Sequence, residues 1–436
     1  MMLDWQTMLL VYVALLGAML MLGCPIAIAL GLTAFAGIVL RHGWDLMPTI
    51  GDIVWNTSNS FTLVAIPMFI LMGEVIMQTG VARRFYRGLA SLLIRVPGGL
   101  AHANIVGCAM FSAICGSSVA TALTMSQVAM PELKRRGYDP GLIAGSLAAG
   151  GTLGILIPPS IPMIIYAVTV QASIVDLFMA GVVPGLILAA LFMVWIAIAV
   201  RRNPALVPQT EIDPAMVRSV GQALWDCTPL VALIGVAIGS LYLGLVTPTE
   251  AGAFGALCAL VIGAGFRELT FEKLRAALSA SVGTSAVVFY IIVTGSLLSF
   301  GIVDSGIARG VSAAVVAADL SPLQFFLIIS VVYIILGMLI EGVSMMLLTV
   351  PVLYPSMIAL GFDPVWFGVV LVVFIELGAL TPPMGLNLFA IHSVAKDIPL
   401  KTIIRGSFPY VIVMLLFLAL LYAFPGIALW LPGTLK

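Results

Sequence analysis

The chain consists mainly of apolar runs that are long enough to cross a bilayer and are separated by short polar segments. A helix needs about 20 predominantly apolar residues to span the hydrocarbon layer, and the pattern predicts ten such spans. They cover residues 6–22, 25–40, 61–79, 140–169, 177–200, 226–245, 250–266, 277–302, 364–394 and 407–430. Two further apolar stretches, about 98–130 and 322–357, are too long for one span. Each is interrupted midway, at Gly116-Ser117-Ser118 and at Glu341-Gly342, so we expect each to form a re-entrant hairpin.

Part of this pattern occurs twice. Residues 131–159 and 355–383 align without a gap at a displacement of 224, and ten of the 29 positions are identical. We interpret this as a duplication. Both copies end in a proline pair, Pro158-Pro159 and Pro382-Pro383, which removes two backbone donors and cannot continue a helix. The spans 140–169 and 364–394 are therefore predicted to be broken helices, which in matching places of two halves indicate a transport site.

Composition excludes most other classes of protein. With 62% hydrophobic and 9% charged residues, the 436-residue chain has too little polar surface for a soluble protein, so it is predicted to be an all-α polytopic membrane protein. The 19 basic and 19 acidic residues balance, which gives no indication of nucleic acid. The five cysteines lack metal-ligand spacing, no phosphate-binding loop is present, and no cofactor is expected. The first apolar run lacks a basic leader and is counted as structure.

The basic residues predict the topology. With both stretches taken as hairpins, 16 basic residues fall on one face and three on the other, so the richer face is predicted to be cytoplasmic. The three are Arg41, Arg309 and Lys436, whereas the 16 include Arg95 and the run 134–136. Each half has five crossings and one hairpin, and because five is odd the second half should be inverted. The predicted organisation is a first repeat 1–202, a cytoplasmic connector 203–225 and a second repeat 226–436.

The hairpin tips and helix breaks are the candidate site. Broken helix ends offer free carbonyls to a cation and free amides to an anion, and sodium prefers hydroxyl and carbonyl oxygens. The first cluster is Ser117 and Ser118 with the backbone around 157–160, and the second is Ser344, Thr381 and Asn387. Acidic residues inside apolar runs also suggest function; they are Glu74, Glu250, Glu341 and Glu376. Basic residues at 83–95 predict an amphipathic cytoplasmic helix that rests on anionic headgroups.

Several strings in both halves resemble the large membrane subunit of tripartite ATP-independent periplasmic (TRAP) transporters. They are AIPMFILMGE (65–74), VPGGLAHANI (96–105), GSSVATA (116–122), ELKRRGYDP (132–140), IPPSIPMIIY (157–166), VTPTEAGAFGA (246–256) and ELGALTPPMGLNLF (376–389). The resemblance implies an elevator-type, sodium-coupled secondary transporter for organic acids in the bacterial inner membrane. It also implies two separate partners, a small four-helix membrane subunit and an extracytoplasmic substrate-binding protein.

Transferred to this chain, the resemblance implies one sodium ion at Gly116, Ser117, Ser118 and the carbonyls near Pro158-Pro159. A second would lie at Gly342, Ser344, Thr381 and the Pro382-Pro383 break. The substrate carboxylate would lie between the two clusters, with Ser160, Glu376 and Asn387 as candidate contacts. Three alternatives stay open at this point. The first is a self-sufficient ion-coupled carboxylate symporter, and the second is a purely structural subunit. The third is an intramembrane hydrolase that uses Ser117 or Ser118, for which His102 is the nearest base and no Gly-x-Ser-x-Gly elbow exists.

Overall fold

The computed structural model describes residues 4–94, 96, 98–207 and 218–434, and the regular structure in these ranges is helical. The first half, with the short helix η2 that follows it, contains α1(Trp5–Met21), α2(Ile26–His42), α3(Met47–Ser58), η1(Phe61–Val64), α4(Ala65–Gln78), α5(Val81–Leu93), α6(Leu100–Cys115), α7(Ser118–Arg135), α8(Pro140–Thr152), α9(Ile161–Val170), α10(Ile174–Arg202) and η2(Pro204–Leu206). The second half contains α11(Val220–Tyr242), α12(Pro248–Gly265), α13(Phe271–Asp304), α14(Ile307–Ala317), α15(Pro322–Gly337), α16(Gly342–Ala359), α17(Pro364–Leu380), α18(Leu386–Val394), α19(Leu400–Ala423) and α20(Gly426–Thr434).

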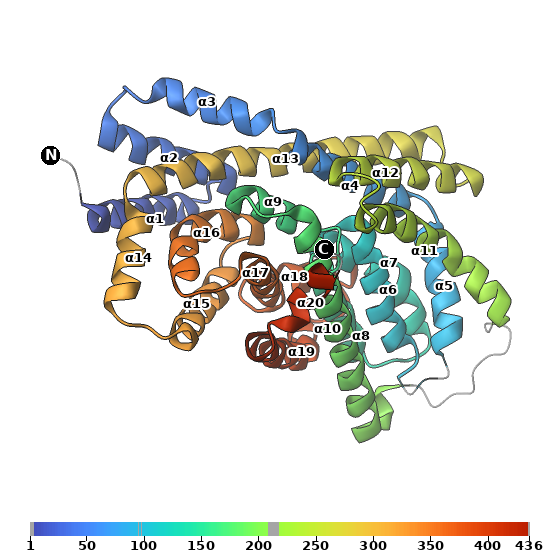
Figure 1. The fold of residues 1–436 in the computed structure, drawn as a ribbon. Helices are drawn as coiled ribbons and strands as arrows, with labels where there is room; N and C mark the ends of the chain where they lie inside the picture. The colour runs from blue at the N-terminus through green and yellow to red at the C-terminus, as the bar shows by residue number, and fades with distance from the viewer. Residues whose placement is uncertain (1–3, 95, 97, 208–217, 435–436) are drawn as a thin grey trace.

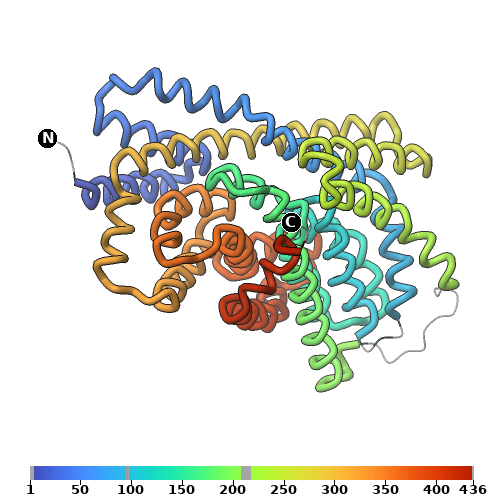
Figure 2. Tube along the Cα trace, in the orientation of Figure 1, coloured from blue at the N-terminus to red at the C-terminus, as the bar shows by residue number. Residues whose placement is uncertain are grey.

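The long helix α13 joins two parts of the molecule. Its 34 residues extend about 51 Å at 1.5 Å per residue. In Figure 1, α2 and α3 lie along its C-terminal part and α4 and α12 lie beside its N-terminal part, and these helices are in contact with it or with one another. The hairpin and broken helices form a second body beneath this layer, and the tube in Figure 2 shows the same division. Seven helices of the described chain are long and apolar enough to cross a membrane.

The helices recur at the displacement found in the sequence. The hairpin helices α7 and α16 both have 18 residues and begin at residues 118 and 342, a displacement of 224. Helices α8 and α17 begin at 140 and 364, again 224 residues apart. In the second of these pairs the N-cap carboxylates match, because Asp139 of α8 and Asp363 of α17 both accept backbone hydrogen bonds from the first turn. The opposite orientation of the two halves in the bilayer stays a prediction.

The two halves exchange contacts at the centre of the molecule. Hairpin helix α7 packs against α18, which follows the break of the other half, and α16 packs against α9. Broken helix α8 packs against α19, and α17 packs against α10. One hydrogen bond of this kind joins the Tyr166 hydroxyl on α9 to the Pro364 carbonyl at the start of α17, at 2.8 Å. The central body is therefore shared by both repeats.

The structure differs from the sequence prediction at several places. Helix α14 was not predicted, because its 11 residues are too few to cross a bilayer. Helix α3 was not predicted, because its 12 residues cover only about 18 Å and cannot cross a bilayer. The end of the predicted connector is helical from Val220, since the Ser219 hydroxyl caps α11 by accepting from Gln222 N at 3.3 Å. The last predicted span ends at Ala423 instead of 430, because Phe424 precedes Pro425 and leaves the helical conformation.

Some predicted features lie outside the described residues. Arg95, Lys436 and residues 208–217 of the connector belong to this group.

The five cysteines are all free; Cys108, Cys115 and Cys227 are buried, and Cys24 and Cys258 are half-buried.

Candidate functional site

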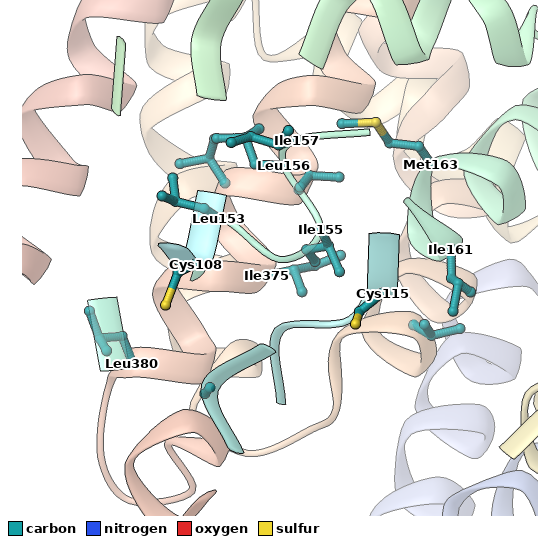
Figure 3. Close-up of a cluster of buried hydrophobic side chains, with 14 of the residues drawn as sticks. Cys108, Cys115, Leu153, Ile155, Leu156, Ile157, Ile161, Met163, Ile375 and Leu380 are labelled. Atoms are coloured by element: carbon teal, nitrogen blue, oxygen red, sulfur yellow. The ribbon is translucent and has the colours of Figure 1, made fainter. Parts of the chain in front are cut away.

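Both hairpin tips and residues at both helix breaks line one cavity of about 380 Å³. Gly116, Ser117 and Ser118 come from the first tip and Gly342 comes from the second. The first break contributes Ile155 and Ile161, and Met384 and Leu386 belong to the second. Figure 3 shows the apolar side chains of the first break, Leu153–Ile157, among Cys108 and Cys115 of the first hairpin and Ile375 of α17. The cavity is thus formed mainly by the hairpins and the broken helices, which are the elements in which the duplication lies.

The first tip touches the first break through backbone atoms. Gly116 ends α6 in the left-handed conformation, with φ 58°, and a methyl group there would lie 2.9 Å from the Pro159 carbonyl oxygen. Ser117 caps α7, and its hydroxyl oxygen accepts a hydrogen bond from Ala120 N at 3.5 Å. A methyl group at Gly154 would lie 2.6 Å from Ser118 Cα and 2.8 Å from the Ser117 carbonyl oxygen. Only glycine lets the chain between α8 and α9 lie this close to the tip.

Ser118 joins the first tip to the second half. Its hydroxyl donates a hydrogen bond to Glu376 Oε1 on α17, and Glu376 is 1% exposed. The second carboxylate oxygen, Oε2, is buried without a hydrogen-bond partner in the described structure. Asn387 on α18 is also fully buried; its Nδ2 donates to the Ala148 carbonyl at 3.4 Å, whereas its Oδ1 has no partner among the described residues. Buried acceptors of this kind are costly unless a proton or a cation satisfies them.

The second tip has a different cap. Glu341 precedes α16, and its carboxylate accepts hydrogen bonds from Val343 N at 3.0 Å, Ser344 N at 3.1 Å and the Ser344 hydroxyl at 3.2 Å. Its charge therefore compensates the positive end of the α16 dipole. The hairpin lies close to α17, because a methyl group at Gly378 would be 2.6 Å from backbone atoms of Gly337. Gly378 matches Gly154 in the duplication, and each of the two glycines lets its segment lie close to the backbone of a hairpin.

The other candidate residues lie behind the cavity or away from it. The Thr381 hydroxyl donates to the Leu377 carbonyl at the end of α17, and Ser344 is held by Glu341. Ser160 is fully buried and caps α9 by accepting from Met163 N at 3.4 Å. The breaks Pro158-Pro159 and Pro382-Pro383 are both cis peptide bonds. The structure thus brings Gly116, Ser117, Ser118 and Gly342 to the cavity. The predicted site residues that are not among the cavity-lining residues are Pro158, Pro159, Ser160, Ser344, Glu376, Thr381, Pro382, Pro383 and Asn387.

Two polar lining residues come from outside the hairpins and broken helices. Glu74 on α4 lines the cavity, and no described residue forms a hydrogen bond or an ion pair with it. Thr284 on α13 also lines the cavity, and the only signal for it in the sequence is a polar residue within an apolar run. Glu250, by contrast, forms a capping box with Thr247 at the start of α12, so its carboxylate has a structural partner.

In the described part of the chain, no group of three or more His, Cys, Asp or Glu side chains is placed so that it could hold a metal ion. A cation at the cavity would instead contact hydroxyl, carboxylate and backbone carbonyl oxygens, which is the ligand set of hard cations.

The chain is similar to known proteins over most of its length. The family described as "Tripartite ATP-independent periplasmic transporter, DctM component" matches residues 13–427. The "C4-dicarboxylate TRAP transporter large permease protein DctM" of Pseudomonas aeruginosa is 34% identical over 410 residues, which cover 93% of this chain and 94% of that protein. The "Sialic acid TRAP transporter large permease protein SiaM" of Vibrio cholerae is 30% identical over 95% of this chain and 96% of its own.

The fold is also found in solved transporters with little sequence similarity. The Alcanivorax borkumensis YdaH transporter is 14% identical and aligns over 90% of this chain and 91% of its own, with a TM-score of 0.57. Neisseria gonorrhoeae MtrF is 13% identical and aligns over 89% of this chain and 85% of its own, with a TM-score of 0.52. These two likenesses concern the fold alone. The family match and the relatives that align over nearly the whole chain show that the chain belongs to the DctM component family of tripartite ATP-independent periplasmic transporters.

Proposed function

We propose that this chain is the sodium-coupled translocation subunit of a transporter that takes up an organic acid across the bacterial inner membrane. The observation that carries the proposal is the single cavity formed by both hairpin tips and both helix breaks. Discontinuous helices of this kind place ion and substrate sites at the interface between repeats. The separate layer that contains α13 supplies a base against which the central body can move, as an elevator mechanism requires.

One sodium ion would lie at the first tip. Ser117 and Ser118 provide oxygens there, and the Pro159 carbonyl approaches Gly116 from the break. Glu376 lies directly behind Ser118, and its Oε2 has no hydrogen-bond partner among the described residues, so a cation at this place would satisfy a buried acceptor. A second sodium ion would lie at Gly342, Ser344 and Thr381 with the Pro382-Pro383 break. The carboxylate of the substrate would occupy the cavity between the two ions, which would offset its charge.

The substrate class is inferred from relatives. Their names include C4-dicarboxylate, sialic acid and 2,3-diketo-L-gulonate permeases, which all transport carboxylates. A small four-helix membrane subunit and an extracytoplasmic binding protein are proposed as partners. A relative from Oleidesulfovibrio alaskensis named "Isethionate TRAP transporter permease protein DctMQ" is covered over only 65% of its length by this chain, which is consistent with a further segment in that protein.

The partner requirement is tested by reconstitution. Proteoliposomes would contain this chain alone, this chain with the small subunit, or this chain with both partners, each under an inward sodium gradient. Uptake of the ligand bound by the cognate binding protein is expected only with both partners present. Saturable uptake by this chain alone would instead establish the self-sufficient symporter.

The ion site is tested by substitution at the first tip. Ser118→Ala removes the hydroxyl that joins the tip to Glu376, and Glu376→Gln keeps an acceptor oxygen but removes the charge. Both variants should raise the half-saturating sodium concentration for uptake by roughly tenfold or more, because a hydrogen bond to a charged group contributes about 1.5–3 kcal/mol. The control is Ser240→Ala on α11, whose hydroxyl donates only to the Ala237 carbonyl. Unchanged sodium dependence in both variants would show that the ion does not bind at this tip.

A further inference from the structure

A second cavity, of about 630 Å³, lies between α5, α7 and Arg218, which is two residues before α11. Five arginines line it: Arg83 and Arg87 of α5, Arg135 and Arg136 at the end of α7, and Arg218. Glu132 is the single acidic side chain in the described lining. This cavity is separate from the one formed by the hairpin tips, and it lies on the face that the basic residues predict to be cytoplasmic.

The acidic groups around α5 are all engaged by other cations. Glu132 accepts from Arg135 and Arg136, each at 2.7 Å. Asp226 of α11 is 2% exposed and accepts from Arg218 and from Arg84 Nε, the latter at 2.9 Å. Glu268 pairs with Lys273 at 3.2 Å.

Arg83 and Arg87 take no part in these ion pairs. No hydrogen bond or ion pair between their side chains and another described residue exists, and both are exposed. They are four residues apart on α5, so their side chains are neighbours on one face of the helix. Like charges at this spacing repel each other and destabilise a helix. An anion between them would remove this repulsion.

We propose that this cavity binds the phosphate group of an anionic phospholipid, held by Arg83 and Arg87 with the arginines of α7 and Arg218. Guanidinium groups form paired hydrogen bonds with phosphate oxygens, and basic pockets between membrane helices on the cytoplasmic side suit anionic headgroups. The apolar surface next to Arg218 favours a lipid over a soluble phosphate. Leu224 is 55% exposed and Trp225 is 66% exposed on the first turns of α11, and tryptophan is typical of the membrane–water interface.

Such a lipid would connect two parts of the transporter. Helix α5 packs closely on α11, whereas α7 carries Ser118 at its other end and belongs to the central body. A headgroup in contact with α5 and α7 would bias the position of the first hairpin relative to α11. The proposed site therefore does not depend on which substrate or coupling ion the transporter uses.

The test is native mass spectrometry of the purified full-length chain titrated with phosphatidylglycerol. Arg83→Gln/Arg87→Gln should weaken retention of this lipid by roughly 25-fold, about fivefold for each arginine near an anionic surface. The matched control is Arg201→Gln/Arg202→Gln, which removes two exposed arginines of the predicted cytoplasmic face that lie outside the cavity; its retention should equal wild type. Arg83→Lys/Arg87→Lys keeps the charge and should lose less than the glutamine variant.

Two further measurements show whether the bound phosphate group belongs to a lipid or to a soluble anion. Phosphatidylcholine has the same phosphodiester without net negative charge and should be retained weakly and equally by all variants. Inorganic phosphate at millimolar concentration should not displace phosphatidylglycerol; displacement that depends on Arg83 and Arg87 would overturn the lipid and assign the cavity to a soluble phosphate. Equal retention of phosphatidylglycerol by wild type and the glutamine variant would overturn the site.

Discussion

Gly154→Ala is the sharpest test of how the first hairpin is held. The added methyl group would lie 2.6 Å from Ser118 Cα and 2.8 Å from the Ser117 carbonyl oxygen, whereas carbon atoms in contact are normally 3.5–4.0 Å apart. Both neighbours are backbone atoms and cannot rotate away, so the tip must move by roughly 1 Å. Overpacking of this kind costs about 1–3 kcal/mol, which corresponds to a roughly 5- to 150-fold change in an equilibrium constant.

The assay is sodium-driven uptake by the reconstituted transporter, with the sodium concentration varied. Because a binding site tolerates displacements of only about 0.5 Å, Gly154→Ala should raise the half-saturating sodium concentration by a factor within that range. Gly235→Ala on α11 is the matched control, since no atom lies within 4 Å of its added methyl group, and it should behave like wild type. Wild-type sodium dependence in Gly154→Ala, with correct insertion of both variants, would refute the contact between break and tip as a determinant of the ion site.

Two other predictions concern the loops. Single cysteines at Arg136 and Ala359, in a background without the five native cysteines, should differ in labelling by an impermeant maleimide, and labelling of both from outside would contradict the inverted repeat. The hydrogen bonds that the Lys134 ammonium donates to Asp397, at 2.7 and 2.8 Å, hold the pKa of that carboxyl below its usual range. The stability contributed by this pair is therefore present above the unfolded pKa of about 3.9 and lost as the pH falls through the folded pKa. Asp397→Asn should slightly lower the melting temperature at pH 7, and this difference from wild type should shrink as the pH falls below about 3.9; a difference that does not change with pH would exclude this pair as the cause.

Local chemistry made the broken helices predictable from sequence. The pair Pro158-Pro159 lacks two backbone donors, and α8 and α9 stop on either side of it. Gly116 likewise marked a chain reversal that the structure confirms, with its left-handed backbone at the end of α6. Such signals act within a few residues, so they need no knowledge of the tertiary structure.

Contacts between distant segments were not predictable in the same way. The apolar pattern shows that α17 is buried on all sides, but a helix that is apolar all round carries no stripe to indicate its neighbours. The bond between Ser118 and Glu376 therefore could not be inferred, although both residues had been singled out separately. The sequence marks Glu341 as an acidic residue inside an apolar run, but its role as the cap of α16 depends on the local backbone of the tip.

The exchange of contacts between the halves has a consequence for biosynthesis. Ser118 and its partner Glu376 are 258 residues apart in the chain, and translation proceeds at about 5–20 residues per second. The first hairpin is thus made roughly 13–50 s before the helix that satisfies its tip. During this interval the polar tip of α7 has no protein partner from the second half, and hydrocarbon cannot supply one. We therefore expect the first hairpin to stay near the aqueous interface or the insertion machinery, because the contact between its tip and the second half is completed only when synthesis is nearly finished.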